Sequence, residues 1–232
     1  MEATIYVIPG SHPSRTGLLM LEHKGIPHRP VVFPPGFHAA AVRLLGFPGQ
    51  TVPAVKIGGR RVQGTRRIAR ALDELQPEPR LLPADPELLE AVEEAERFGD
   101  EELQPAARRL ATAAVMRGGL SALHEQGDEG RLGKLLTARP GARRRILRLV
   151  AWRFGVDRAV EARDRERLLG WLDRVDRWIG EGVLGGPALN AADFQIVTSL
   201  ALIDYVVELR PLLRSRPAGA LMDRVLPGER GL

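Results

Sequence analysis

The segment Tyr6-Val-Ile-Pro-Gly-Ser-His-Pro-Ser-Arg15 joins an apolar run to an amphipathic stretch through a Gly-Ser-x-Pro-Ser turn. Residues Thr4–Ile8 are apolar enough for a buried strand. Residues Ser14–Lys24 carry leucines with helical spacing and stop before Gly25, a favourable residue for a helix C-terminus. We therefore predict a strand that leads directly into a helix, with Ser11 in the turn between them.

The residues that follow, up to position 75, contain several further short elements. The predicted elements are a strand His28–Phe33, a loose helix Phe37–Leu45, strands Ala54–Ile57 and Arg61–Gln63 around the hairpin signal Gly58-Gly59, and a helix Thr65–Leu75. The order is strand–helix–strand, a helix, then strand–strand–helix. This order is thioredoxin-like and predicts a mixed sheet with helices on its faces.

A proline-rich stretch, Gln76–Pro86, separates this part from a remainder in which no segment is convincing as a strand. The helices predicted there are Glu87–Phe98, Glu101–Met116, Ala142–Phe154, Asp157–Ile179 and Ala191–Leu209. The fold class predicted is α/β followed by all-α. We expect a thioredoxin-like domain over residues 1–78 and an all-helical domain over residues 87–232.

The composition excludes several kinds of protein. Of the 232 residues 44% are hydrophobic, yet no apolar run approaches the roughly 20 residues of a membrane span. The first residues lack the features of a secretory signal, so we expect a cytoplasmic location and no membrane partner. The absence of cysteine excludes disulfides and a redox thiol on the protein. Any thiol chemistry must therefore use a thiol that a ligand supplies.

Charge and histidine spacing argue against two further classes. The net charge is +5, but 29 acidic residues are interspersed with the basic ones, so we expect a solvated surface and no nucleic-acid partner. The five histidines form no His-x-x-x-His pair and have no clustered acids beside them, and we expect no metal site.

Four pieces of sequence, in this order and spacing, resemble the soluble glutathione transferases along nearly the whole chain. They are Pro9–Arg15, Gln50–Pro53, Val62–Arg66 with Ile68, and Asn190–Phe194. The resemblance is closest to the serine-type classes, which include the insect delta class. It implies glutathione as co-substrate, a small electrophile as acceptor, a detoxification role and a homodimer.

Ser11 is the candidate catalytic residue that this resemblance implies. A free thiol has a pKa of about 8.5, and a hydroxyl that donates to the sulfur contributes roughly 1.5–3 kcal/mol. The dipole of the following helix adds about 0.3–1 kcal/mol, so Ser11 can hold a glutathione thiolate without a protein base. Three alternatives stay open. Ser11 can be a plain helix cap, or the hydroxyl that meets the sulfur can belong to Ser14 or to Tyr6. For Tyr6, an offset of one residue from the position of the tyrosine-type classes turns the side chain to the opposite face of the strand.

The resemblance assigns the other ligand contacts residue by residue. Pro53 matches a cis proline whose preceding residue, here Val52, pairs its backbone with the cysteinyl part of glutathione. Thr65 and Arg66 open a helix whose start holds the γ-glutamyl carboxylate. Two further residues, Gln50 and His38, match positions that reach the glycyl end.

One position departs from the family pattern. Gly64 stands where the family usually has glutamate, which removes the carboxylate that meets the ligand's ammonium group and about 1.5–3 kcal/mol of binding. Gln63 offers a neutral acceptor, and Asp100 of a partner subunit offers a charge. The alternative functions are a weakly binding or non-catalytic protein of this fold, and a glutathione-dependent peroxidase or isomerase.

Two further groups of residues have local interpretations. Asn190 and Asp193 form an Asn-x-x-Asp box ahead of an apolar helix, which predicts reciprocal capping and a role in folding. Trp152 and Arg153 follow the basic run Arg143–Arg145. One interpretation is a helix with a solvent-exposed basic face, and the other is that Trp152 or Arg153 lines the electrophile pocket.

Overall fold

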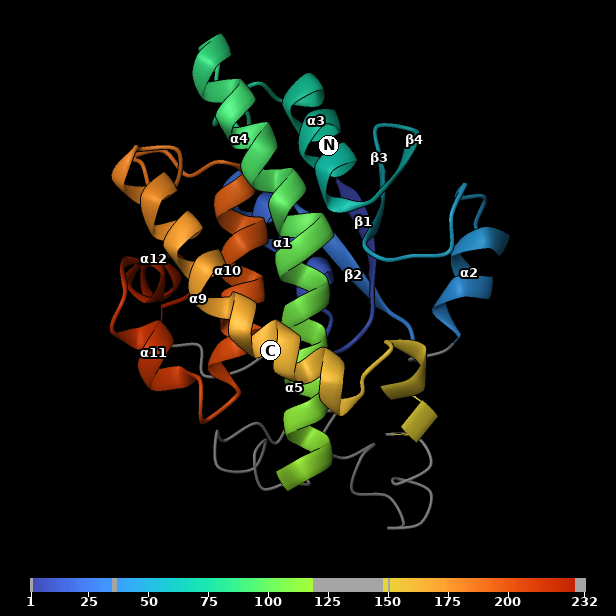
Figure 1. The fold of residues 1–232 in the computed structure, drawn as a ribbon. Helices are drawn as coiled ribbons and strands as arrows, with labels where there is room; N and C mark the ends of the chain where they lie inside the picture. The colour runs from blue at the N-terminus through green and yellow to red at the C-terminus, as the bar shows by residue number, and fades with distance from the viewer. Residues whose placement is uncertain (1, 35–36, 119–147, 150, 228–232) are drawn as a thin grey trace. The chain divides into compact units, whose positions relative to one another are not determined.

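A computed structural model describes residues 2–34, 37–118, 148–149 and 151–227 (Figure 1). Contacts divide the chain into two compact units, the first being Met1–Glu96 with Val183–Thr198 and the second Arg97–Gly182 with Ser199–Leu232. The predicted domains, residues 1–78 and 87–232, are continuous stretches of sequence, whereas each contact-based unit combines two separate stretches. The predicted limits therefore stay a prediction.

The first unit contains a mixed sheet of four strands, in the order β2-β1-β3-β4. The strands are β1 (Ala3–Val7), β2 (His28–Val32), β3 (Ala54–Ile57) and β4 (Arg60–Gln63). β1 runs parallel to β2 and antiparallel to β3, and the β3–β4 hairpin turns at Gly58-Gly59, both with positive φ. The predicted thioredoxin-like order is therefore confirmed.

Helices of this unit pack on both faces of the sheet, because successive strand side chains point to opposite faces. The helices of the unit are α1 (His12–His23), α2 (His38–Leu44), α3 (Thr65–Leu75), most of α4 (Pro86–Phe98) and the first part of α10 (Ala191–Asp204). On one face Tyr6 is buried in a cluster with Val42 of α2 and with Phe47. On the other, Ile5 lies against α1 at Gly17, where an added Cβ would come within 3.0 Å of it.

α1 begins two residues earlier than the sequence predicted, at His12 instead of Ser14. Ser11 has extended backbone angles and caps the helix, and Pro13 fits the first turn, where its missing N–H is no loss. The strand before it is Ala3–Val7, one residue earlier than predicted.

The second unit is helical, as predicted for this part of the chain. Within the described ranges, its helices are the end of α4, a π-helical turn (Gly99–Leu103), α5 (Gln104–Gly118), α9 (Arg158–Gly180), the end of α10, α11 (Arg210–Arg214) and α12 (Pro217–Val225). Within it, Phe98 meets Trp178 edge-on at 5.4 Å, and the Arg174 guanidinium lies over both rings. No helix of the described ranges combines the length and the apolar character that a membrane crossing requires.

Two predicted helix limits in this part were wrong. The break expected between Phe98 and Glu101 is absent, because a single π-helical turn carries the chain on into α5. The helix predicted to reach Leu209 ends at Asp204, where Arg210 donates to the Asp204 carbonyl at 3.0 Å and Arg214 pairs with its carboxylate. The predicted helix Ala142–Phe154 and the run Arg143–Arg145 lie largely outside the described residues.

Candidate functional site

The topology of the sheet gathers the sequence-predicted residues of the first unit at one edge. β1 and the parallel β2 both end there, with Val7 beside Val32, and the antiparallel β3 begins there, since Ala54 pairs with both Tyr6 and Gln63. Every predicted ligand contact belongs to a segment that leaves or reaches this edge: Ser11, His38, Gln50, Val52, Pro53, Gly64, Thr65 and Arg66.

Ser11 lies at the start of α1, half-buried, with its hydroxyl in the helix cap. Its Oγ accepts the Ser14 N–H at 3.3 Å, and its own N–H donates to the Ile8 carbonyl at 3.3 Å. Among the described residues its hydroxyl hydrogen has no acceptor. Capping therefore uses an acceptor lone pair of Ser11 and leaves its donor function for a ligand.

Ser14 is a weaker candidate for the same role. Each Oγ accepts one backbone N–H, that of Ser14 from Ile8 at 3.5 Å, but Ser14 is buried whereas Ser11 is half-buried. The helix start also offers fewer amide donors than its sequence suggested, because Pro13 has no N–H and the Ser14 N–H is bonded to Ser11. Tyr6 is excluded by its position, since its ring stacks on Phe33 at 5.7 Å within the core cluster.

The Val52–Pro53 peptide bond is cis, and it lies immediately before β3. Pro53 is buried against α1, where a Cβ at Gly17 would lie 3.2 Å from the Pro53 Cβ, and its carbonyl accepts the Gly64 N–H at 3.0 Å. Val52 is only half-buried, and neither its N–H nor its C=O has a hydrogen-bond partner in the part of the chain that the structure describes. This backbone is therefore available for pairing with an extended ligand.

The start of α3 has no side-chain cap. Gly64 occupies the cap position with φ 88° and ψ 140°, a region that is essentially restricted to glycine, and the first turn contains no acidic residue. Thr65 is buried there with its hydroxyl at the helix end. A helix start with unused amides, a hydroxyl and Arg66 is suited to a carboxylate.

Gln63 holds the neighbouring loop, and this contact already uses one lone pair of the oxygen considered as an acceptor for the ligand's ammonium group. Its Oε1 accepts the Gly49 N–H at 2.7 Å and its Nε2 donates to the Thr51 carbonyl at 2.6 Å. The loop approaches so closely that a Cβ at Gly49 would lie 2.8 Å from this Oε1. The clamp holds the two residues on either side of Gln50, whose own side chain is exposed.

A network behind α3 was not predicted. Arg70 donates to the Arg66 carbonyl, to Glu93 and to Glu96, each at 2.9 Å. Glu96 is fully buried, and its carbonyl accepts the Gln195 amide at 3.1 Å. Residues one turn apart on α3 share a face, so the pair Arg66 and Arg70 was visible in the sequence, but the acids that meet it come from another helix.

The surroundings of this network shift the pKa of the Glu96 carboxyl. Burial raises the pKa of the Glu96 carboxyl, while the hydrogen bond and charge of Arg70 and the charge of Arg66 oppose that rise. Glu96 Oε1 and Arg66 Nε are both buried without a hydrogen-bond partner among the described residues. Glu96 therefore contributes negative charge behind the first turn of α3 at a cost in desolvation.

One remaining sequence candidate belongs to the first unit, and two belong to the second. His38 is the first residue of α2, half-buried. Asp100 belongs to the π-helical turn of the second unit, and the role considered for it in a partner subunit stays untested. Trp152 is 77% exposed in the same unit. The described residues contain no group of acids and histidines that could hold a metal ion.

The Asn190–Asp193 box caps α10 reciprocally, as predicted. Asn190 Oδ1 accepts the N–H groups of Ala192 and Asp193 at 2.9 and 3.2 Å, and Asp193 Oδ2 accepts the Asn190 N–H at 2.9 Å. Asp193 Oδ1 also accepts the Gly185 N–H at 2.7 Å. All of these groups are occupied within the fold, so the box is structural.

Comparison with known proteins agrees with this arrangement. Residues 5–80 match the family model described as "Glutathione S-transferase, N-terminal domain". No curated protein matches the chain.

Several solved structures share the fold. One is a glutathione S-transferase from Methylobacterium radiotolerans in complex with glutathione sulfonate, at 18% identity and TM-score 0.65, covering 99% of this chain and 92% of that one. Another, CsGST63524 of Ceriporiopsis subvermispora in complex with glutathione, has 17% identity and TM-score 0.66 and covers 98% of each chain. A third, from Methylobacillus flagellatus with GSH bound, has 17% identity and TM-score 0.63 and covers 98% of this chain and 95% of that one. These likenesses show the fold along nearly the whole chain.

Proposed function

We propose that this protein is a serine-type glutathione transferase that joins the sulfur of glutathione to an electrophilic small molecule. The observation that carries the proposal is the sheet edge where Ser11, the unbonded backbone of Val52 and the uncapped start of α3 all lie. The family match over residues 5–80 supports it, as do the glutathione complexes among the structurally similar proteins.

Ser11 supplies the chemistry in this proposal. Its free O–H donates to the glutathione sulfur, and the charge-assisted bond, at about 1.5–3 kcal/mol, lowers the thiol pKa by roughly one to two units. The positive end of the α1 dipole acts in the same direction. The thiolate then attacks the electrophilic carbon, a C–S bond forms, and the electron pair leaves with the departing group or is protonated on the acceptor.

The remaining residues position the tripeptide. The N–H and C=O of Val52, next to Pro53, pair with the cysteinyl unit, and Thr65 with the amides of α3 and Arg66 holds the γ-glutamyl carboxylate. Gln50, set by the Gln63 clamp, and His38 lie on the segments that reach the glycyl end. We further propose a cytoplasmic homodimer with a role in detoxification, as in the family that the sequence resembles.

The decisive experiment compares three substitutions at Ser11. Ser11→Ala removes the hydroxyl and the cap, Ser11→Gly removes the hydroxyl but costs the cap only a few tenths of a kcal/mol, and Ser11→Thr keeps both. We expect turnover at neutral pH to fall about ten-fold or more in the alanine and glycine variants, because less of the bound thiol is ionised. Turnover of the threonine variant should stay close to that of the wild type.

Ultraviolet absorbance of the bound thiolate, followed against pH, measures the pKa of the bound glutathione thiol directly. The apparent pKa of bound glutathione should rise in Ser11→Ala and Ser11→Gly, with little change in affinity. Ser14→Ala is the matched control, since that hydroxyl is buried and faces the Ile8 N–H. Unchanged turnover and an unchanged thiol pKa in both hydroxyl-free variants would refute the assignment of Ser11.

A second candidate is a protein of this fold that binds glutathione weakly and does not use it as a substrate. Two observations favour it: Gly64 supplies no carboxylate, and both ends of the Gln63 side chain are occupied. Calorimetry with glutathione separates the two, since absent or millimolar binding supports the second. Where binding is tight, a panel of electrophiles, hydroperoxides and isomerisable substrates distinguishes transfer from a related peroxidase or isomerase activity.

A further inference from the structure

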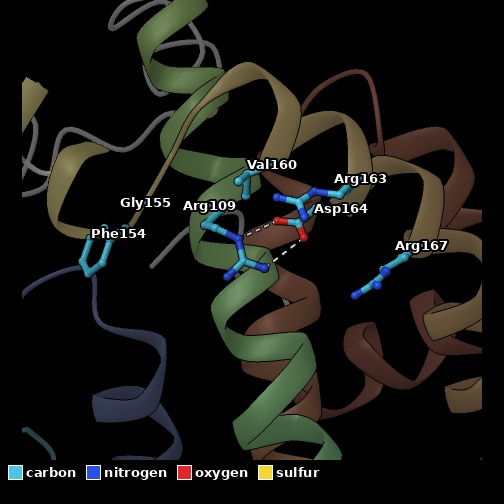
Figure 2. A pocket seen from close by; sticks show the side chains of 7 residues that line it. All are labelled: Arg109, Phe154, Gly155, Val160, Arg163, Asp164 and Arg167. Carbon is cyan, nitrogen blue, oxygen red and sulfur yellow. Dashed lines mark hydrogen bonds and ion pairs between the residues drawn. The ribbon is translucent and has the colours of Figure 1, made fainter.

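A pocket of about 380 Å³ lies in the second unit, between α5, the turn after residue 153 and α9. This volume is within the range of small-molecule sites, about 300–1,000 Å³. Its lining combines basic groups with an apolar wall (Figure 2), and consists of Arg109, Phe154, Gly155, Val160, Arg163, Asp164 and Arg167.

The carboxylate in this lining is already paired. Arg109 reaches from α5 to Asp164 on α9 and forms two parallel bonds, Nε to Oδ2 at 2.7 Å and Nη2 to Oδ1 at 2.9 Å (Figure 2). Asp164 is buried, and its two oxygens are both engaged by this fork. The Arg109–Asp164 pair therefore forms a neutral wall, and it offers no counter-charge to the remaining arginines.

Arg163 and Arg167 lie one helical turn apart on the same face of α9. Both are exposed, and neither forms an ion pair with any residue in the described ranges. Like charges at this spacing repel each other, which is unfavourable for the helix. An anion in the pocket would remove that repulsion.

More positive charge surrounds the apolar wall. The Arg108 guanidinium lies 4.9 Å from the centre of the Phe154 ring, in the geometry of a cation–π contact. Burial lowers the pKa of Arg108, and the charges of Arg153 and Arg109 add to this effect. The wall against which a ligand's apolar part would rest is therefore flanked by guanidinium groups.

Two acids at the start of α9 are engaged in other contacts, and the exposed Glu166, which lies nearer in sequence, does not line the pocket. Asp157 caps the helix by accepting the Val160 N–H at 2.8 Å. Glu161 bonds to Arg165 at 2.9 Å and to Arg117. The excess positive charge of the pocket therefore has no counter-charge on these two residues.

We propose that this pocket binds a small organic molecule with an oxyanion head group, a phosphate or a carboxylate. Arg163 and Arg167 hold the head group, since guanidinium groups match the geometry of these oxyanions and remain charged. Phe154 and Val160 contact an aromatic or aliphatic part of the ligand. This site belongs to the helical unit and is independent of the glutathione proposal.

Calorimetry on the full chain with phenyl phosphate, benzoate and the neutral analogue phenol tests the proposal. The oxyanions should bind and phenol should not, and the tighter of the two oxyanions identifies the head group. In the double variant R163S/R167S the affinity should fall about a hundred-fold, since each of the two charge-assisted contacts contributes roughly a factor of ten. The control R29S/R177S removes the same charge from exposed sites outside the pocket and should stay within about two-fold of wild type.

Additional variants keep the result interpretable. Arg163 and Arg167 are exposed and unpaired in the described structure, and the relief of their repulsion opposes the lower helix propensity of serine, so R163S/R167S should unfold close to the wild-type temperature. R163K/R167K keeps the charge without the planar fork and should give an intermediate affinity. Ser11→Ala should leave phenyl phosphate binding unchanged, which separates this site from the proposed glutathione site. Equal losses in R163S/R167S and R29S/R177S, or no binding of either oxyanion, would overturn the proposal.

Discussion

Two helix starts within the first unit differ in how their polar groups are satisfied. At α10, Asn190 and Asp193 bond to each other's backbone, and Asp193 also bonds to Gly185. At α3, Gly64 provides no cap, and the first turn has no acid. A start whose groups are all occupied stabilises the fold, whereas a start with unused donors has binding capacity left for a ligand.

What replaces the cap at α3 is support from outside the helix. The Gly64 N–H donates to the Pro53 carbonyl at 3.0 Å, and Arg70 holds the Arg66 carbonyl while it is bonded to Glu93 and Glu96. These contacts keep the first turn in place without occupying its amides. The difference between the two starts therefore separates a folding element from a candidate binding element.

The largest expected loss of stability is at the start of α10, where the polar groups are all bonded. Asp193→Ala removes the acceptors of the Asn190 and Gly185 N–H groups, and each unsatisfied donor costs about 1–3 kcal/mol. Urea unfolding should therefore show a loss of about 3 kcal/mol or more in the free energy of unfolding. The control Asp85→Ala removes an exposed cap, with Oδ1 2.8 Å from the Leu88 N–H, and should cost about 1 kcal/mol. Similar losses at both sites would contradict the comparison.

A smaller effect is expected when the uncapped start receives a side chain. A Cβ at residue 64 would meet no atom within 4 Å, but Gly64→Ala and Gly64→Glu both force a side chain into a positive-φ conformation at a cost of about 1–3 kcal/mol. The two variants should therefore unfold with similar free energies.

The variants Gly64→Ala and Gly64→Glu also test whether a carboxylate at residue 64 strengthens glutathione binding. Gly64→Glu should bind glutathione about ten-fold more tightly than Gly64→Ala, because it restores a charged partner for the ligand's ammonium group. Calorimetry on the two variants gives the ratio directly. Equal affinities would mean that the ammonium group of the bound tripeptide does not lie near residue 64.

The smallest expected effect is the pH dependence of stability that comes from Glu96, which supports α3 through Arg70. Because burial raises the pKa of Glu96 in the native state, the native protein keeps a proton that the unfolded chain releases above about pH 4. Stability from this group therefore falls as pH rises from the unfolded pKa through the native one. Glu96→Gln should remove that fall, so the difference in unfolding free energy between variant and wild type should shift in favour of the variant as pH rises.

A parallel variant isolates this effect. Glu93→Gln removes the half-exposed acid that also bonds to Arg70, and reports the general result of losing one carboxylate there. Unfolding curves of both variants over the acidic range provide the test. A pH-independent difference between Glu96→Gln and wild type would show that the buried carboxyl keeps its ordinary pKa.

Local signals in the sequence predicted much of the fold. Gly58-Gly59 marked the hairpin, the spacing of apolar residues marked α3, and the Asn190–Asp193 box marked the start of α10. Each of these signals acts between residues that are close in sequence, so neighbouring chemistry is sufficient to identify them.

The errors arose where distant residues decide the outcome. The end of α10 at Asp204 depends on Arg210 and Arg214, which follow it after a turn. The clamp that Gln63 forms was not predicted, because its partners Gly49 and Thr51 lie across the loop.

The linear order of residues was enough to indicate a thioredoxin-like half, a helical remainder and a hydroxyl at the start of the first helix, because spacing and turn chemistry are short-range properties. Only the folded chain showed that, among the residues the structure describes, the Ser11 hydroxyl hydrogen and the Val52 backbone have no partner. It also showed that Arg109 neutralises Asp164, while Arg163 and Arg167 have no ion-pair partner in the same ranges. Whether a polar group is free depends on which partners the fold brings to it, and those partners come from segments far apart in the chain.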